Sequence, residues 1–285
     1  MEHGARPLRS VRGVDVPAFF YGTAWKEERT QALTAQALRA GFRAVDTANQ
    51  RRHYVEAAVG DAVRAALESG ALARSDVFLQ TKFTFARGQD QRIPYDPHAA
   101  FAAQVEQSFE SSLDHLGVTS LDSYLLHGPW SGSGLDHADW EVWSAFEALH
   151  AAGRVRLLGI SNVSLEQLEL LHRKAGVKPA FVQNRCYART GWDREVRAFC
   201  RANDVAYQAF SLLTANAREL QSRAVRGVAE RLQATPAQVV FRFALEVGMI
   251  PLTGSSDPEH LRQDLACFEL ELDEREVTAI ENVSG

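Results

Sequence analysis

Short apolar segments alternate with helical patterns along the whole chain. Eight of these segments have the length of strands, and several are apolar throughout, which is typical of parallel strands covered on both faces. We expect strands at Phe19–Gly22, Phe42–Thr47, Val77–Lys82, Leu121–His127, Val155–Ser161, Ala180–Asn184, Val205–Ser211 and Met249–Thr253.

The intervals between these segments have the pattern of helices. Apolar residues recur at helical spacing from Phe101 to Leu116, and Gly117 stops the pattern. Thr235 and Pro236 are the residue types that begin another helix. Strands that alternate with helices favour either a closed barrel or a doubly wound sheet.

The glycine pattern separates these two folds. A doubly wound dinucleotide-binding sheet has a GxGxxG turn after an early strand. No such turn is present, since the segment SGSG at 131–134 lacks the third glycine and a helix start. We therefore predict an α/β fold, a (β/α)8 TIM barrel formed by residues 1–285 as a single domain. Residues 1–17 would add a strand or hairpin that closes the bottom of the barrel.

Composition and charge exclude several classes of protein. Apolar residues make up 46% of the 285 residues, as in ordinary globular proteins. The formal net charge of −5 disfavours binding to nucleic acid and to anionic membranes. The cysteines lie far apart, and no histidine spacing indicates a metal site. No segment has the pattern of a membrane span or a signal peptide. We expect a cytoplasmic protein without membrane, nucleic-acid or metal partners, and the sequence carries no signal for its oligomeric state.

Three ionisable residues, Asp46, Lys82 and His127, stand at the ends of consecutive predicted strands. Each has an ordinary structural explanation by itself, as a helix cap, a snorkelling lysine or a hydrogen-bonded histidine. In a barrel, however, the carboxyl ends of the strands meet at one mouth, where catalytic groups lie. Together the three side chains can shift the pKa of a neighbouring hydroxyl.

The segments that contain these residues resemble, together with several others, the aldo-keto reductase family over nearly the whole chain. The matching segments are, in order, VDTA with Asp46, QTK with Lys82, LLH with His127, AAGRVRLLGISNVS, PAFVQNRCY, AYQAFSLL and IPLTGSSDPEHLRQDL. The resemblance implies an NAD(P)H-dependent oxidoreductase that reduces the aldehyde or ketone group of a small molecule to an alcohol by hydride transfer. Two alternatives stay open: a cofactor-binding regulatory protein of the same fold with little turnover, and a barrel hydrolase or isomerase that uses no nicotinamide.

The resemblance also implies a role for each matching residue. The catalytic group would be Asp46, Tyr54, Lys82 and His127, with Tyr54 donating a proton and Lys82 and Asp46 easing the ionisation of its phenol. The cofactor would be held by Gly22, Thr23, Ser161, Asn162, Gln183, Phe210, Ser211, Leu213, Gly254, Ser255, Ser256, His260, Gln263 and Asp264. The substrate would contact His53 and an aromatic wall made by Trp25 and Trp130, although a tryptophan that packs a loop down is an equal alternative for Trp130.

The proton donor is the least regular part of the match. The family pattern runs from DTA through a short spacer to a tyrosine, whereas this chain has the longer stretch NQRRHYVEAAVG. Counting back from Glu56 puts His53 at the tyrosine position. Either His53 has replaced the tyrosine, or the loop bulges and brings Tyr54 to the site. We favour Tyr54, because a histidine beside Lys82 would lose basicity through like-charge repulsion.

The cofactor turn and the last helix give two further expectations. Relatives that favour NADP place a lysine and an arginine where this chain has Leu252 and His260, although Arg262 is close in sequence. We expect NADPH as the cofactor, with weakened discrimination against NADH. Family members usually continue past the last helix, predicted at Asp273–Asn282, with a loop over the substrate, so we expect an open site and broad specificity.

Overall fold

The core of the protein is a closed barrel of eight parallel strands, seen in a computed structural model that describes residues 7–284. The strands follow one another around the barrel in chain order, and β10 closes it by pairing with both β3 and β9. Their bounds are β3 Phe20–Gly22, β4 Ala44–Asp46, β5 Phe78–Phe83, β6 Leu121–Leu126, β7 Val155–Ser161, β8 Phe181–Arg185, β9 Ala206–Phe210 and β10 Met249–Thr253. Each predicted strand segment overlaps one of these strands, and only β5 and β8 extend beyond it, by one residue each, so the predicted (β/α)8 fold is confirmed.

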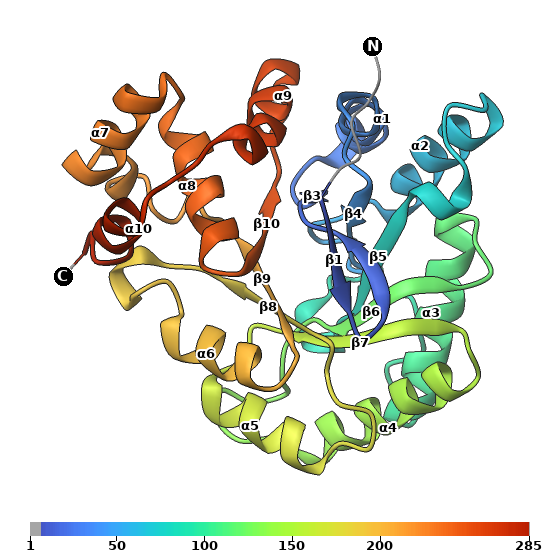
Figure 1. Ribbon diagram of the computed structural model, residues 1–285. Coiled ribbons are helices and arrows are strands. Elements are labelled where there is room, and N and C mark those ends of the chain that lie inside the picture. Colours follow the sequence, from blue (N-terminus) through green and yellow to red (C-terminus); the bar gives the residue numbers. More distant parts are fainter. Residues whose placement is uncertain (1–6, 285) are drawn as a thin grey trace.

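Helices surround the strands (Figure 1) and cover the outer face of the barrel. They are α1 Thr30–Ala40, α2 Glu56–Glu68, α3 Phe101–Leu116, α4 His137–Ala151, α5 Leu165–Lys174, α6 Arg194–Ala202, α7 Arg223–Leu232, α8 Pro236–Glu246, α9 Pro258–Ala266 and α10 Glu274–Glu281. Short 3-10 helices lie at η1 Glu27–Arg29, η2 Arg74–Asp76, η3 Ala86–Gly88, η4 Ala188–Thr190, η5 Glu219–Gln221 and η6 Cys267–Glu269. Two helices, α7 and α8, lie between the last two strands, and α8 begins at Pro236 as predicted.

Local sequence signals set the ends of these helices. The hydroxyls of Ser164 and Thr235 accept hydrogen bonds from backbone N–H groups in the first turns of α5 and α8. At the other end, Gly41 and Gly117 follow α1 and α3 with φ of 111° and 66°, in the left-handed region that favours glycine. The chain therefore turns back toward the barrel where the glycines stand.

An antiparallel hairpin precedes the barrel and lies over the middle of the ring of strands in Figure 1. It consists of β1 Leu8–Val11 and β2 Val14–Pro17. Val11 and Val16 are buried in one apolar cluster with barrel residues such as Phe78 and Ile250. The hairpin thus packs on the barrel interior. It falls within residues 1–17, where a strand or hairpin was predicted, and residues 1–6 lie outside the described part of the chain.

Some predicted strands are longer than the observed ones, because the hydrogen-bonded pairing with the neighbouring parallel strand ends before the predicted segment does. Thr47, His127 and Ser211 follow directly after β4, β6 and β9. These residues therefore belong to loops at the carboxyl end of the barrel, which is where side chains of TIM barrels form an active site.

Candidate active site

A cleft of about 660 Å³ opens at the carboxyl ends of the strands. Most of the residues predicted for catalysis, cofactor and substrate line it, which brings together segments from nearly the whole chain. The predicted residues on its wall are Gly22, Trp25, Asp46, His53, Tyr54, His127, Ser161, Asn162, Gln183, Phe210, Ser211, Leu213, Gly254, Ser255, His260, Gln263 and Asp264.

The base of the cleft contains a buried ion pair. Lys82 Nζ lies 2.7 Å from both carboxylate oxygens of Asp46 and donates a third hydrogen bond, of 2.8 Å, to the carbonyl oxygen of Thr47. Burial lowers the pKa of Lys82, and the Asp46 carboxylate opposes that shift. All three ammonium protons are thereby engaged, so the lysine is held in one position.

Tyr54 lies against this ion pair. Its ring centre is 5.5 Å from Lys82 Nζ and 5.9 Å from the imidazole centre of His127. Burial raises the pKa of Tyr54, and the Asp46 charge raises it further. We expected Asp46 and Lys82 to ease ionisation of the phenol. The pKa direction is the opposite, because Asp46 neutralises the lysine and the surroundings are poorly solvated.

His53 lies apart from the ion pair. Its ring stacks on the indole of Trp25 at 3.9 Å between centres, and its carbonyl accepts a hydrogen bond from the Trp25 backbone N–H. The N–H groups of His53 and Tyr54 both donate to the carbonyl of Gln50, which forms the turn that the longer spacer allows. The geometry therefore puts Tyr54, rather than His53, beside Lys82.

His127 approaches Tyr54 from the end of β6. Its Nδ1 is 2.7 Å from the hydroxyl oxygen of Thr84. Burial, with further contributions from Lys82 and His53, lowers the pKa of His127 to about 3. The imidazole is therefore neutral near pH 7, and with Nδ1 engaged, Nε2 is the nitrogen available to a ligand.

A layer of buried amides supports Asp46 from inside the barrel. The side-chain amides of Gln80 and Gln183 donate to Asp46 Oδ1 at 2.7 and 3.0 Å, and both also donate to the side-chain carbonyl oxygen of Gln208. Sequence reasoning missed Gln80 and Gln208. The sequence did contain a signal for them, because each is a polar residue at an inward-facing position of an otherwise apolar strand. Such buried polar side chains need hydrogen-bond partners, which in a barrel interior are other buried polar side chains.

The side of the cleft assigned to the nicotinamide has strained backbone. Asn162 and Ser211 have φ of 53° and 58°, which is uncommon for residues with side chains. The Asn162 amide donates to the His127 carbonyl oxygen at 2.8 Å and to the Ser161 hydroxyl at 3.1 Å. Ser161, Asn162 and Gln183 thus lie in one hydrogen-bonded patch, and Phe210 shares the same cleft.

In the turn predicted to bind the phosphates, some of the backbone N–H groups already have hydrogen-bond partners. The Asp257 carboxylate caps α9 by accepting from the N–H groups of Glu259 and His260. These N–H groups already have an acceptor, so the helix start by itself is a poor anion site. Lys26, which the sequence reasoning missed, is buried with Nζ 2.6 Å from the Gly254 carbonyl oxygen. Burial, and to a smaller extent Arg29, lowers its pKa to about 8.

Four predicted site residues lie outside the cleft wall, and one of them, Lys82, lies beneath it in the buried ion pair with Asp46. Thr23 is fully buried, and its hydroxyl donates to the Asp46 carbonyl oxygen. Ser256 is exposed beyond the turn. Trp130 does not form a wall with Trp25, because its indole packs edge-on against Phe85, with the ring centres 5.0 Å apart. The expectation of a paired tryptophan wall is corrected: Trp130 holds its own loop down.

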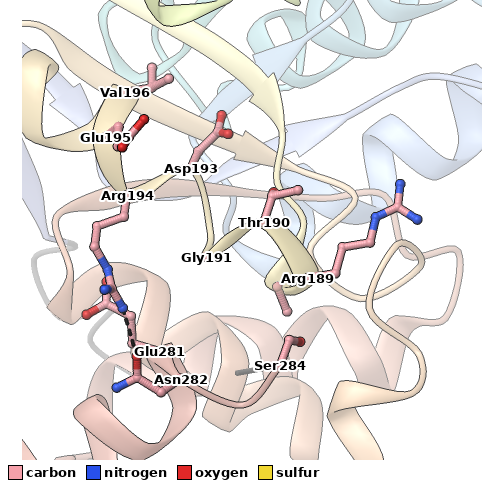
Figure 2. Close-up of a pocket in the computed structure, with 11 residues that line it drawn as sticks. Arg189, Thr190, Gly191, Asp193, Arg194, Glu195, Val196, Glu281, Asn282 and Ser284 are labelled. Atoms are coloured by element: carbon pink, nitrogen blue, oxygen red, sulfur yellow. Dashed lines mark hydrogen bonds and ion pairs between the residues drawn. The ribbon is translucent and has the colours of Figure 1, made fainter.

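A different hollow, of about 490 Å³, lies between the loop after β8 and the end of α10 (Figure 2). Arg194 of this hollow pairs with Glu281 at 3.4 Å and donates a 3.0 Å hydrogen bond to the side-chain oxygen of Asn282. It contains none of the predicted site residues, and we assign no role to it. Among residues 7–284, no three His, Cys, Asp or Glu side chains are grouped as a metal site would require, and no helix has the length and apolarity to cross a membrane.

Comparison with protein families places the chain clearly. Residues 19–284 match the model of the family described as the aldo/keto reductase family. An aldo-keto reductase of Mycobacterium sp. (strain KMS) is 34% identical over 259 residues, which cover 90% of this chain and 84% of that protein.

Solved structures show the same likeness. The aldo/keto reductase of Brucella melitensis has a TM-score of 0.83 and 27% identity, covering 98% of this chain and 100% of that one. An aldo-keto reductase of the silkworm Bombyx mori, solved both by itself and in complex with NADPH, has the same fold, with a TM-score of 0.84, 24% identity and coverage of 98% of this chain and 88% of that one.

Proposed function

This chain belongs to the aldo/keto reductase family of NAD(P)H-dependent enzymes, and on that premise we propose that it reduces small aldehydes and ketones with Tyr54 as the proton donor. One observation carries the proposal. Tyr54 and His127 lie together in the cleft, above the buried pair of Lys82 and Asp46. A cofactor-binding protein without turnover would have no need of a buried ion pair beneath a phenol, so the regulatory alternative is less well supported.

The cleft fits a nicotinamide cofactor. It runs from Asp46 to the turn at Gly254, so one continuous space of about 660 Å³ joins the catalytic cluster to the phosphate turn. The donor and acceptor groups of Ser161, Asn162 and Gln183 suit a carboxamide, and Phe210 supplies an aromatic face. When bound, the reduced cofactor supplies a hydride to the carbonyl carbon of the substrate.

The residues of the chain would supply the proton and the orientation. Tyr54 has a raised pKa, so it stays protonated through the neutral range and donates its proton as negative charge develops on the carbonyl oxygen. The Lys82 ammonium lies close enough to stabilise the resulting phenolate. Neutral His127, with Nδ1 accepting from the Thr84 hydroxyl, would direct Nε2–H to the carbonyl oxygen and fix its position.

We infer that NADPH is preferred over NADH by a modest factor. The two cations expected for a 2′-phosphate are replaced by Leu252 and His260. Arg262 is paired with Glu259 on the surface, so it is not free to replace them. Lys26 brings a positive charge to the turn from a different segment. A preference below about a hundredfold, equivalent to 2.7 kcal/mol, is the expected outcome.

The experiment is oxidation of NADPH and of NADH, followed by absorbance, with a panel of neutral aromatic and aliphatic aldehydes and ketones. We expect turnover with several members of the panel. A protein that binds NADPH, as seen by nicotinamide fluorescence, but oxidises it with no carbonyl compound would be the regulatory protein instead. No change in fluorescence on mixing would contradict both.

A further inference from the structure

A side hollow of about 570 Å³ adjoins the catalytic cleft. It lies between the loops that follow β6, β7 and β8, and the two cavities share Asn162 and Arg185 on their walls. Asn162 also donates a hydrogen bond to the His127 carbonyl oxygen, so the hollow begins directly behind the loop of the catalytic histidine. A substrate whose carbonyl group lies at His127 can therefore extend into it.

Two arginines, Arg87 and Arg185, line this hollow, and among residues 7–284 neither forms a close ion pair with a carboxylate, although the Arg87 charge opposes the rise in the pKa of the buried Asp139 carboxyl. Arg185 ends β8, and its guanidinium lies 5.5 Å from the ring centre of Phe210. Arg51, in the loop after β4, is by contrast paired with Glu27. The carboxylate of the hollow itself, Asp193, is engaged by the Asn184 amide at 3.1 Å and the Tyr207 hydroxyl at 2.7 Å.

The second arginine, Arg87, is held in place from both sides. Its guanidinium lies 4.7 Å from the ring centre of Trp130 and donates a 2.6 Å hydrogen bond to the Pro129 carbonyl oxygen. Trp130 is itself fixed against Phe85. The planar cation is therefore oriented before a ligand arrives, and less conformational entropy is lost when it binds an anion.

We propose that the natural substrates are carbonyl compounds that carry a carboxylate, and that Arg185 and Arg87 bind this carboxylate in the side hollow. The proposal rests on the reductase function given above and specifies its substrate class. A guanidinium presents two parallel N–H groups that match the two oxygens of a carboxylate. A carboxylate anchored behind Asn162 leaves the carbonyl group at the other end of the molecule beside Tyr54 and His127.

The test compares 4-carboxybenzaldehyde with methyl 4-formylbenzoate, which has a similar shape and no charge. We expect kcat/KM for the acid to exceed that for the ester at least tenfold. Arg185→Gln should lower this ratio at least tenfold and Arg87→Gln should lower it severalfold, while Arg185→Lys keeps part of it. The matched control is Arg189→Gln, the same charge change on an exposed arginine of the loop after β8 that does not itself line the hollow.

Each outcome decides one of the two proposals. Equal rates for acid and ester, or an acid-to-ester ratio that Arg189→Gln lowers as much as Arg185→Gln does, would overturn the carboxylate site and leave the reductase function standing. If neither aldehyde is reduced, the reductase function fails at this test. The hollow is then judged by calorimetric binding of 4-(hydroxymethyl)benzoate to the protein with NADP⁺. Tenfold weaker binding to Arg185→Gln than to wild type supports the site, and equal binding overturns it.

Discussion

Tyr54 carries a proton that its surroundings make hard to remove. Burial of the phenol raises the pKa of Tyr54, and the charge of Asp46, which pairs with Lys82 at 2.7 Å, raises it further. A raised pKa suits an acid that must remain protonated until charge develops on the substrate. The lysine then acts on the phenolate that forms, where a positive charge has most effect.

Replacement of the phenol hydroxyl tests this assignment. Tyr54→Phe is expected to bind NADPH with unchanged affinity and to lose at least a hundredfold in kcat, as when a positioned acid is removed. His53→Ala is the matched comparison, since His53 stacks on Trp25 away from Lys82. If Tyr54→Phe remained active and His53→Ala did not, His53 would be the acid.

The depressed pKa of His127 links this residue to stability. Its pKa is about 3 in the folded protein, against about 6.5 in the unfolded chain. Below pH 6.5 the unfolded chain binds a proton that the folded protein does not, so the free energy of unfolding falls as pH falls from about 6.5 toward 3. Between pH 7.5 and 5, wild type should lose about 2 kcal/mol more than His127→Asn does, measured by urea unfolding at each pH. An equal loss in the two proteins would mean that His127 titrates normally.

Single residues differ in how far the sequence predicts them. Asp46, Lys82 and His127 could be found because each stands within one residue of the end of an apolar strand, and strand ends meet at one mouth. The choice between His53 and Tyr54 depended on how a loop folds, which spacing alone does not determine. Arg185 gave no signal either, because an exposed arginine becomes informative only when the surrounding loops show that it lacks a partner.

At the scale of elements, the cofactor turn after β10 depends on a segment from the other end of the chain. Lys26 follows β3 and hydrogen-bonds the Gly254 carbonyl, because β3 and β10 are neighbours in the closed sheet. Pairing between the first and last strands is a property of closure, and no local sequence pattern indicates it. Lys26 was for this reason missed by the sequence reasoning.

Removal of this charge should weaken cofactor binding. Lys26→Met is expected to raise the Kd for NADPH about tenfold, by loss of a buried positive charge near the phosphates, measured by nicotinamide fluorescence. Arg262→Met is the control, because Arg262 already pairs with Glu259. An equal effect of the two variants would point to the general field of the protein and not to a contact at the turn.

Helix packing gives a second test at this scale. Gly60 in α2 touches the end of α3 so closely that an added Cβ would lie 2.0 Å from the His115 carbonyl oxygen. Gly60→Ala should lower the free energy of unfolding by about 3 kcal/mol through overpacking. In contrast, Gly227 in α7 has open space around it, so Gly227→Ala should raise the free energy of unfolding by about 0.5–1 kcal/mol. Urea unfolding of both variants measures the difference, and a stable Gly60→Ala protein would show that α2 and α3 can move apart.

At the scale of the whole molecule, the two ends of the barrel have different tasks. The carboxyl end holds the cleft and the side hollow. The amino end is covered by the hairpin β1–β2, and Arg9 of the hairpin donates to the Gly248 carbonyl oxygen just before β10. The barrel itself was the most predictable part of the structure. Apolar strands alternate with helices throughout the chain, and a closed sheet buries all of these strands in one core. The hairpin register and its contacts could not be predicted, since they depend on the shape of the barrel opening.

The division predicts that the hairpin contributes to stability and not to catalysis. Val16 is fully buried in the apolar cluster at the amino end, so Val16→Ala should lower the free energy of unfolding by about 2 kcal/mol through lost burial and a residual cavity. Leu8 is 58% exposed in the same hairpin, and Leu8→Ala should change stability by less than about 0.5 kcal/mol. Urea unfolding gives the stabilities, and NADPH oxidation at saturating substrate gives kcat for each folded variant. We expect kcat of Val16→Ala to equal that of wild type, because the barrel core separates the hairpin from Tyr54. A loss of kcat without a loss of stability would instead show that the amino end is coupled to the active site through the strands.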